Sequence, residues 1–349
     1  MKRLYIGSMT GQSGKQVITL GLGLALKKRG LEIGYIKPIG KSPLYVDGKL
    51  VDADAEVFHR AVGLEEPLEK TSPLVYTIEL LRKAMTGRLK NTGRKLLKEI
   101  ETLQAELVLI AGTTDIFEGS LFGVNGLRIC QMEGTKALIV ERWRPEETVD
   151  DLLAAKELLG SALAGTVINR VDPQSLKEVQ KEVVPFLKRH GIKVFGVVPD
   201  EKALSAVTVK DLVDALGAKV ISGREHLDAL VENFSIGAMD VTHALRYFQR
   251  IPKKAVITGA HRADIQMAAL ETSTRCIILT GGGQPNDVII ARAREKAVPI
   301  LSVRTDTYTT VDRIEALLGS AKMRDPQRLP LVRDLVERHI DIKGLLRAI

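Results

Sequence analysis

The chain has 349 residues, 45% of them hydrophobic and 27% charged, which is typical of a globular protein with two or three domains. Its formal charge of +8 comes from 51 basic and 43 acidic residues that are spread along the chain, and only 4% of the residues are aromatic. These features argue against a nucleic-acid-binding protein, which would gather its basic residues into a patch and offer aromatic rings for base stacking.

Two cysteines occur, Cys130 and Cys276, each inside an apolar segment. They cannot build a metal cluster or a disulfide framework, so a reducing cytoplasm is the expected compartment. The first residues, MKRLYIGS, enter a predicted strand directly, without the pattern of a signal peptide. No apolar run approaches the ~20 residues that a membrane-spanning helix needs. We therefore expect a cytoplasmic protein that does not cross a membrane.

In the first part of the chain, short apolar runs alternate with segments of helical periodicity such as residues 17–30 and 175–191. The second of these ends on a glycine after basic residues, a typical helix end. Strands that are apolar throughout and separated by helices predict an α/β fold with a parallel sheet covered on both faces. The predicted strands are 3–7, 32–37, 106–112, 136–141, 162–170 and 193–199.

A second series of strands and helices begins at residue 254, after a helix-like segment and a turn-rich stretch in residues 208–252. We place the domain boundary near Leu216, which gives domains at 1–215 and 216–322. Residues 323–349 are predicted to form a proline-punctuated helical extension. The predicted strands of the second domain are 254–259, 275–281 and 298–303, and its predicted helices are 262–271, 286–296 and 311–319.

The stretch GSMTGQSGKQ follows the first predicted strand and precedes a helix. Gly7, Gly11 and Gly14 let the backbone turn sharply, so that successive N–H groups can point at an anion. Lys15 would open the helix beside that anion, where the helix N-terminus adds partial positive charge. The spacing departs from G-x-x-x-x-G-K-[ST], because Met9 stands at the first glycine position. The stretch predicts a phosphate-binding loop, with an ordinary turn before a helix as the alternative.

The order of these features resembles the dethiobiotin-synthetase-like branch of P-loop proteins joined to a DRTGG domain. That pairing occurs at the N-terminus of long phosphotransacetylases and in free-standing relatives. The stretched loop, Lys37-Pro38, the acidic segment 52–55 and Asn169-Arg170 match motifs of the first domain, and KAVITGAHRADIQMAAL, IILTGGG and DTYTTVDRIEAL match the second. The resemblance covers nearly the whole chain up to about residue 320. It implies a P-loop parallel sheet flanked by helices, followed by a smaller α/β domain.

The resemblance also implies roles for residues that follow predicted strands. Lys37 would contact a γ-phosphate or an acidic substrate, with a surface lysine before a turn as the alternative. Asp54 would contact the ligand, but N-capping of the helix that follows explains either Asp52 or Asp54 equally well. Asn169 would hydrogen-bond the nucleotide base, unless it only ends its strand at a turn.

Magnesium-dependent members of this branch carry Ser or Thr after the loop lysine and a Glu-Gly pair after the strand that matches 106–112. Gln16 and Ala111 stand at these positions here, so two oxygen ligands are altered. An amide oxygen can bind magnesium, and Asp54, Asp115 and Glu118 are candidates for the missing carboxylate, although such loop residues are usually solvated. The resemblance thus implies ATP or another adenine nucleotide as the cofactor, with a weakened magnesium site.

In the second domain, TGAHRADIQ and TGGG each follow a predicted strand and precede a helix, so their glycines would meet at one edge of the sheet. An arginine beside backbone N–H groups suits a phosphate, but ordinary strand-to-helix turns explain the same pattern. His261 stands where the family motif has aspartate. The resemblance implies a module that senses a small molecule or dimerises. The candidate ligand residues are Gly259, Arg262, Asp264, Gly281 and Gly282.

Three functions follow from these features. The first is a regulatory or sensor protein that binds a nucleotide and lacks the acyl-transfer domain of phosphotransacetylases, since the sequence stops where that domain would begin. The second is an ATP-dependent synthetase of the dethiobiotin synthetase type, using Lys15 and Lys37, and the altered metal positions count against it. The third is a non-catalytic protein that binds a metabolic enzyme or dimerises through its second domain. We favour the first.

Overall fold

The computed structural model describes residues 2–201, 206–320 and 328–349. The chain forms two compact units, one made of Met1–Asp200 with Met323–Ile349 and the other of Glu201–Lys322. The structure divides the chain earlier than the predicted boundary near Leu216. The reason is that strand β11 (Val207–Thr208) and helix α11 (Val209–Leu216) already bury apolar side chains in the core of the second unit.

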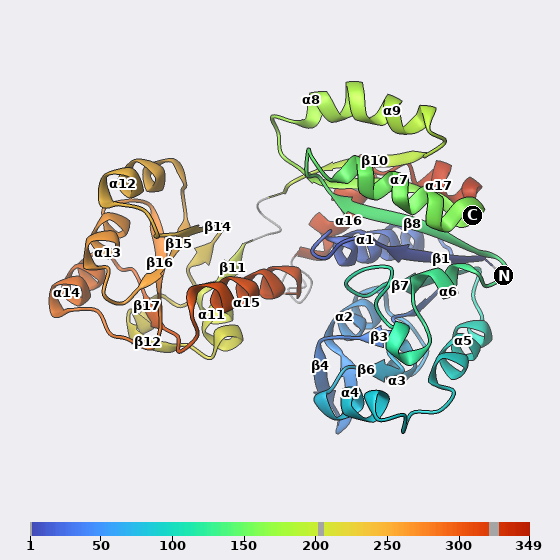
Figure 1. The fold of residues 1–349 in the computed structure, drawn as a ribbon, viewed down its shortest axis with the longest axis horizontal. Helices are drawn as coiled ribbons and strands as arrows, with labels where there is room; N and C mark the ends of the chain where they lie inside the picture. Colours follow the sequence, from blue (N-terminus) through green and yellow to red (C-terminus); the bar gives the residue numbers. More distant parts are fainter. Residues whose placement is uncertain (1, 202–205, 321–327) are drawn as a thin grey trace. The chain divides into compact units, whose positions relative to one another are not determined.

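The first unit contains a six-stranded sheet in the order β10–β9–β8–β1–β7–β2, in which all neighbouring strands are parallel (Figure 1). Every residue of β7 is buried, because helices cover both faces of the sheet. The predicted α/β fold is confirmed. The strands are β1 (Lys2–Gly7), β2 (Ile33–Ile36), β7 (Leu107–Ala111), β8 (Thr135–Arg142), β9 (Leu163–Val171) and β10 (Val194–Pro199).

Two groups of helices cover this sheet. Helix α1 packs against α2 and α16 on one face, while α6 and α7 contact β1, β8 and β9 on the other. The predicted helix 175–191 is observed as α8 (Leu176–Glu178), a π-helical turn (Val179–Val183) and α9 (Val184–Arg189). The π turn ends beside Pro185, which has no N–H to donate. The other bounds are α1 (Lys15–Lys28), α2 (Ala53–Val62), α5 (Thr92–Thr102), α6 (Gly126–Cys130), α7 (Thr148–Leu159) and α16 (Leu329–His339).

The segment between β2 and β7 adds small elements outside the main sheet. Strands β4 and β5 form a hairpin that turns at Asp47-Gly48, and both turn residues have positive φ, 49° and 77°. An Asp-Gly pair adopts this conformation readily, so the hairpin has a local cause. The segment consists of β3 (Ile39–Gly40), β4 (Pro43–Val46), β5 (Lys49–Asp52), α3 (Leu68–Thr71), β6 (Leu74–Val75) and α4 (Ile78–Met85), besides α2 and α5.

The last part of the chain belongs to the first unit. Helix α16 lies against α1 at Gly21, where any side chain would clash with Val336. After α16, Ile340 forms an antiparallel bridge to Gly196, and α17 (Ile342–Ala348) follows. The predicted extension over 323–349 is therefore helical where it is described and forms an integral layer of the first unit. Its residues 323–327 lie outside the described residues.

The second unit has a five-stranded sheet in the order β12–β17–β16–β15–β14, with β12 antiparallel to its neighbour and the other pairs parallel (Figure 1). Helices α12, α13 and α14 share one apolar core, and α11 and α15 share the other. The elements not yet bounded are β12 (Lys219–Ser222), β13 (Leu230–Val231), β14 (Asn233–Ile236), α12 (Val241–Arg250), β15 (Lys254–Gly259), α13 (Ala263–Leu270), β16 (Thr274–Thr280), α14 (Asp287–Glu295), β17 (Ile300–Ser302) and α15 (Thr307–Ser320).

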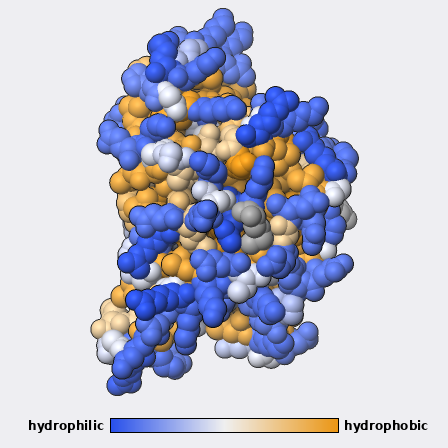
Figure 2. Space-filling model, turned by 90° about the vertical axis from the view of Figure 1, so that its right-hand side faces the viewer, coloured by the Kyte–Doolittle hydropathy of each residue, from blue (hydrophilic) through white to orange (hydrophobic). Residues whose placement is uncertain are grey.

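Hydrophilic side chains are spread over the face shown in Figure 2, as the distribution of charge along the sequence predicts. In the described part of the chain, no helix has the length and apolar character needed to cross a lipid bilayer.

Candidate functional site

The glycine-rich loop joins β1 to α1 at the edge where the parallel strands end. Gly14 precedes α1 with a φ of 78°, a left-handed conformation that favours glycine. A side chain at this position would also clash with Asn169, whose amide nitrogen donates to the Ser13 carbonyl at 2.8 Å. The buried Asn169 therefore fixes the loop to the end of β9. This contact uses the side chain that the resemblance assigns to a nucleotide base.

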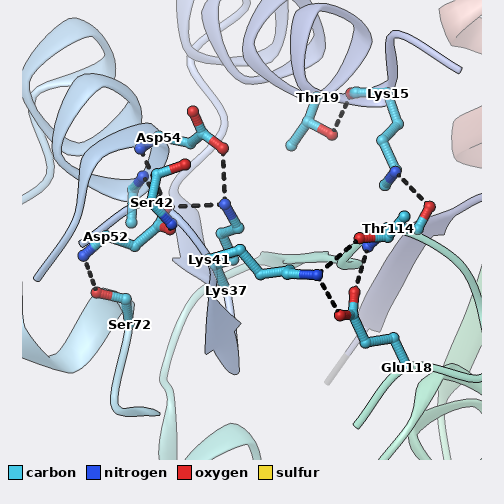
Figure 3. A network of polar contacts seen from close by, with 11 residues as sticks. Lys15, Thr19, Lys37, Lys41, Ser42, Asp52, Asp54, Ser72, Thr114 and Glu118 are labelled. Atoms are coloured by element: carbon cyan, nitrogen blue, oxygen red, sulfur yellow. Dashed lines mark hydrogen bonds and ion pairs between the residues drawn. The ribbon is translucent and has the colours of Figure 1, made fainter. Parts of the chain in front are cut away.

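Lys15, the first residue of α1, is buried, with 3% of its surface exposed. Its Nζ donates to the carbonyl of Thr114, in the segment after β7, at 3.0 Å (Figure 3). Burial lowers the pKa of Lys15 to about 8, and the charge of Glu141 opposes this shift. The ammonium group is thus held at the sheet edge by a neutral partner, where an incoming anion would stabilise its charge.

Lys37 follows β2 and is equally buried, but its ammonium group is paired. Nζ lies 2.8 Å from Oδ1 of Asp52 and 2.7 Å from Oδ2 of Asp54 (Figure 3). Burial alone would lower the pKa of Lys37, yet the two carboxylates outweigh it and the pKa is raised. Asp52 also caps α2, accepting hydrogen bonds from the N–H groups of Asp54 and Ala55. The predicted residues Lys37 and Asp54 therefore meet at the edge, bound to each other.

A cavity of about 10 Å³ is bordered by Lys15 and Lys37. Gln16, Asp54 and Ala111 also border it, so the two altered positions of the expected magnesium site face the same space. A space of this volume holds roughly one water molecule.

The segment after β7 uses the other two candidate metal ligands for its own structure. Oδ1 of Asp115 accepts hydrogen bonds from the N–H groups of Phe117 and Glu118 at 2.8 and 2.9 Å. Glu118 accepts from the Thr114 N–H at 2.8 Å and pairs with Lys41 at 2.5 Å (Figure 3). Within the described ranges, no group of three His, Cys, Asp or Glu side chains could hold a metal ion. Asp115 and Glu118 are thus both engaged in contacts within the protein, which weakens them as magnesium ligands.

Sequence reasoning missed Glu141, which lies near the end of β8 beside the loop. This residue is fully buried, and its carboxylate accepts hydrogen bonds from the Met9 N–H and from the Thr10 hydroxyl, the latter at 2.9 Å. Burial raises the pKa of Glu141 to about 7, although these hydrogen bonds oppose the shift. An acidic residue at the end of the apolar run KALIVE is the signal that could have identified it.

In the second unit, the first candidate loop follows β15, which ends at Gly259. Arg262 binds Asp264 through Nε and Nη2 at 3.0 and 2.9 Å, and its Nη2 also donates to the Met239 carbonyl at 3.0 Å. The hydrogen bonds between the two side chains raise the pKa of Arg262 and lower that of Asp264. The arginine predicted to meet a phosphate is therefore already paired with a carboxylate.

The second candidate loop follows β16, which is the neighbour of β15, so the two loops lie at one sheet edge. The N–H groups of Gly281 and Gly282 donate to the carbonyls of Thr305 and Val303 at 3.0 and 2.8 Å. Both glycines have positive φ, 82° and 73°, as a tight turn requires. These amides bind the segment after β17 and do not point at an open site.

Comparison with known families matches nearly the whole chain. The model of a family described as an AAA domain matches residues 2–208, and the model of the DRTGG domain matches residues 211–317. The two matches meet between Thr208 and Asp211, at the start of α11.

The curated relatives include phosphate acetyltransferases from several bacteria. Those of Synechocystis sp. and Nitratidesulfovibrio vulgaris are each 26% identical to this chain, with 98% of this chain and 51% of the relative covered. The phosphate acetyltransferase of Pseudomonas aeruginosa is 24% identical, with coverage of 94% and 49%. The chain thus spans about half the length of the curated relatives it matches.

Solved structures with similar parts are more distant. One contains the CBS and DRTGG domains of the regulatory region of a Clostridium perfringens pyrophosphatase complexed with the activator diadenosine tetraphosphate. It is 18% identical and covers 43% of this chain and 73% of its own, with a TM-score of 0.30. Another is a cobyrinic acid a,c-diamide synthase from Mycobacterium smegmatis with a bound ATP analog and magnesium. It is 14% identical and covers 57% and 84%, with a TM-score of 0.37. Neither likeness bears on the ligand of this chain.

The matched families agree with the geometry of the two units, each a mainly parallel sheet with glycine loops at its strand ends. The chain belongs to the family in which a dethiobiotin-synthetase-like P-loop domain, matched by the AAA model, precedes a DRTGG domain, and it is homologous to the N-terminal half of phosphate acetyltransferases.

Proposed function

We propose that this chain is a regulatory protein that binds an adenine nucleotide, ATP above all, at the loop between β1 and α1. One observation carries the proposal. The ammonium group of Lys15 is buried at the N-terminus of α1, and among the described residues no carboxylate lies within ion-pair distance of it. A buried cation with a neutral partner is destabilised, and the phosphate of a ligand would relieve that cost.

We propose binding without steady ATP hydrolysis. Phosphoryl transfer needs cationic charge, usually including a metal ion, close to the transferred phosphate. Here the second lysine of the edge, Lys37, is neutralised by two carboxylates. Gln16 and Ala111 stand where a magnesium site needs a hydroxyl and a carboxylate, and the nearby carboxylate of Asp54 is bound to Lys37. These features disfavour the synthetase alternative and agree with a nucleotide-binding regulatory role.

The second unit is proposed to sense a small molecule or to join two copies of the chain. This proposal rests on the match to the DRTGG model and on the meeting of two loops at the edge of its sheet. A cytoplasmic location is part of the same proposal, and the two buried free thiols of Cys130 and Cys276 support it.

Calorimetry on the purified chain tests the nucleotide site. ATP and ADP are titrated with and without magnesium into the wild type, Lys15→Ala and the control Lys90→Ala, which removes an exposed lysine of the same unit. We expect binding by the wild type and the control, and at least tenfold weaker binding by Lys15→Ala, because a charge-assisted contact is lost. Little dependence on magnesium is expected.

Failure of well-folded wild type to bind any nucleotide would end the proposal. Steady ATP hydrolysis that disappears in Lys15→Ala would favour the synthetase instead. If neither loop binds a ligand and the protein co-purifies with a metabolic enzyme, the third function, a non-catalytic binding partner, is supported. Sedimentation with and without ATP reports whether the chain dimerises.

A further inference from the structure

The first N–H groups of the glycine-rich loop already face an anion that the protein itself supplies. Oε1 of Glu141 accepts from the Met9 N–H and lies 3.4 Å from the Thr10 nitrogen, and Oε2 accepts from the Thr10 hydroxyl at 2.9 Å. Glu141 lies on β8, the neighbour of β1, so the sheet itself places its carboxylate under the loop. A nucleotide phosphate would seek the same kind of partners.

The charged groups around Glu141 come from each element that borders the loop. Lys15 of α1 attracts the carboxylate, and Asp151 of α7 repels it. Arg144 connects the two sides, because its Nη2 donates to the Thr10 hydroxyl at 3.0 Å and to Asp151 at 2.9 Å. Arg170, at the end of β9, lies close to Gly14. Two arginines and a lysine thus lie around the loop, together with one buried carboxylate that would oppose the charge of an anionic ligand.

We propose that Glu141 is a built-in inhibitor of the nucleotide site. Its carboxylate competes with the ligand's phosphate for the Met9 N–H and for the N–H and hydroxyl groups of Thr10. This inference rests on the proposed nucleotide binding. Two anions cannot share these donors without repulsion, because the site is buried and water screens little of their charge. The ligand therefore binds the form in which Glu141 is protonated or has moved away from the loop.

The competition makes binding depend on pH in a predictable direction. The pKa of Glu141 is raised to about 7, so the side chain is neutral in most molecules at pH 6 and charged in most at pH 8. If only the neutral form binds, apparent affinity falls by the fraction of molecules that are competent. With a pKa of about 7, the loss is about elevenfold at pH 8, about twofold at pH 7 and about 1.1-fold at pH 6.

The substitution Glu141→Gln removes the negative charge of the side chain and keeps its shape. The amide oxygen can still accept from the Met9 N–H, and the amide nitrogen can donate to the Thr10 hydroxyl, so the loop keeps its hydrogen-bonded support. If Glu141 only holds the loop in place, this variant binds nucleotide as the wild type does. If its charge competes with phosphate, the variant binds more tightly, and the gain grows with pH.

The experiment measures ATP affinity without metal by calorimetry at pH 6, 7 and 8 for the wild type, Glu141→Gln and Glu157→Gln. The control, Glu157→Gln, removes one negative charge from an exposed position of α7. The ratio of variant to wild-type affinity is the readout, because the titration of ATP itself affects both proteins and cancels. We expect a ratio near 1 at pH 6 that rises to about 10 at pH 8 for Glu141→Gln, and a ratio near 1 throughout for the control.

Each outcome decides the inference. A ratio that rises with pH supports it, and so does binding by Glu141→Gln alone at pH 8 when the wild type binds at pH 6. A ratio that is flat or below 1, with wild type that binds, overturns the inhibitor and leaves the nucleotide site intact. No binding by any protein at any pH rejects both. Thermal melting checks that the variants are folded, and Glu141→Ala serves as a second variant that must bind at least as tightly as the wild type at pH 8.

Discussion

The two units end their parallel strands in similar glycine loops, yet the two edges differ in what they leave for a ligand. At the first edge, the buried ammonium group of Lys15 donates to the Thr114 carbonyl, and no carboxylate of the described residues contacts it. At the second edge, the guanidinium group of Arg262 is bound to Asp264, and the loop amides of Gly281 and Gly282 donate to carbonyls of the same unit. The first edge thus offers a buried cation to an anionic ligand, whereas the cation of the second edge is already paired with a carboxylate.

The largest effect on stability is expected at the first edge, where the two buried lysines are replaced one at a time. Lys37→Met leaves the carboxylates of Asp52 and Asp54 buried without a counter-ion, and we expect the free energy of unfolding to fall by about 3–5 kcal/mol. Lys15→Met replaces a buried ammonium group that no carboxylate contacts in the part of the chain that the structure describes, and it should cost less than about 1 kcal/mol. Urea denaturation followed by circular dichroism at pH 7.5 gives both values. Equal losses would mean that the two lysines do not differ as the contacts indicate.

The first edge, unlike the second, should also make the stability of the protein depend on pH near neutrality. Burial raises the pKa of Glu141 from 4.5 to about 7, so the stability it contributes is fully present below pH 4.5 and is lost as pH rises through 7. Relative to Glu141→Gln, the wild type should therefore lose up to about 3 kcal/mol of unfolding free energy between pH 4.5 and 7.5. Denaturation at four pH values measures this difference.

Arg262→Gln is the matched variant at the second edge. The hydrogen bonds of its ion pair move both pKa values away from neutrality, so its stability relative to wild type should stay constant over the same pH interval. A pH response in the second edge that equals that of the first would contradict the comparison.

A smaller effect distinguishes the glycines of the two loops. Gly14 and Gly281 have nearly the same φ, 78° and 82°, so alanine at either position costs ~1–2 kcal/mol of backbone strain. At Gly14 the added methyl group would also meet the Asn169 side chain, whereas nothing lies within 4 Å of it at Gly281. We expect Gly14→Ala to be the more destabilising by about 1 kcal/mol and the only one of the two to weaken ATP binding. Denaturation and calorimetry on both variants check this.

Most strands of the two main sheets could be predicted because each contains an unbroken apolar run. Runs such as 107–111 and 255–257 can be recognised without knowledge of their partners, since strands buried on both faces are apolar along that run. The hairpin β4–β5 and helix α12 were missed although each has a local signal, Asp47-Gly48 at the hairpin turn and Asp240 as the helix cap. Neither element contains an unbroken apolar run, so both signals were read as parts of loops.

The position of the candidate site could be predicted from the sequence, but the ion pairs and hydrogen bonds within it could not. The loop follows β1, Lys37 follows β2 and Asn169 lies near the end of β9, so their meeting at one edge of the parallel sheet follows from topology. The pairing of Lys37 with Asp52 and Asp54 depends on how the hairpin before α2 folds back. No local sequence pattern predicts this arrangement. Glu141 was passed over because a single charge at a strand end is usually solvated, and its burial is visible only in three dimensions.

Helix α16 is encoded after the whole second unit, yet it packs on α1 of the first unit. During synthesis, about 120 further residues follow residues 1–200 before helix α16 is made and can pack on the first unit. During that interval the side of α1 beside Gly21 lacks its contact with α16. The second unit is thus inserted in the sequence of the first, and it is made before the two ends of the first unit can be joined.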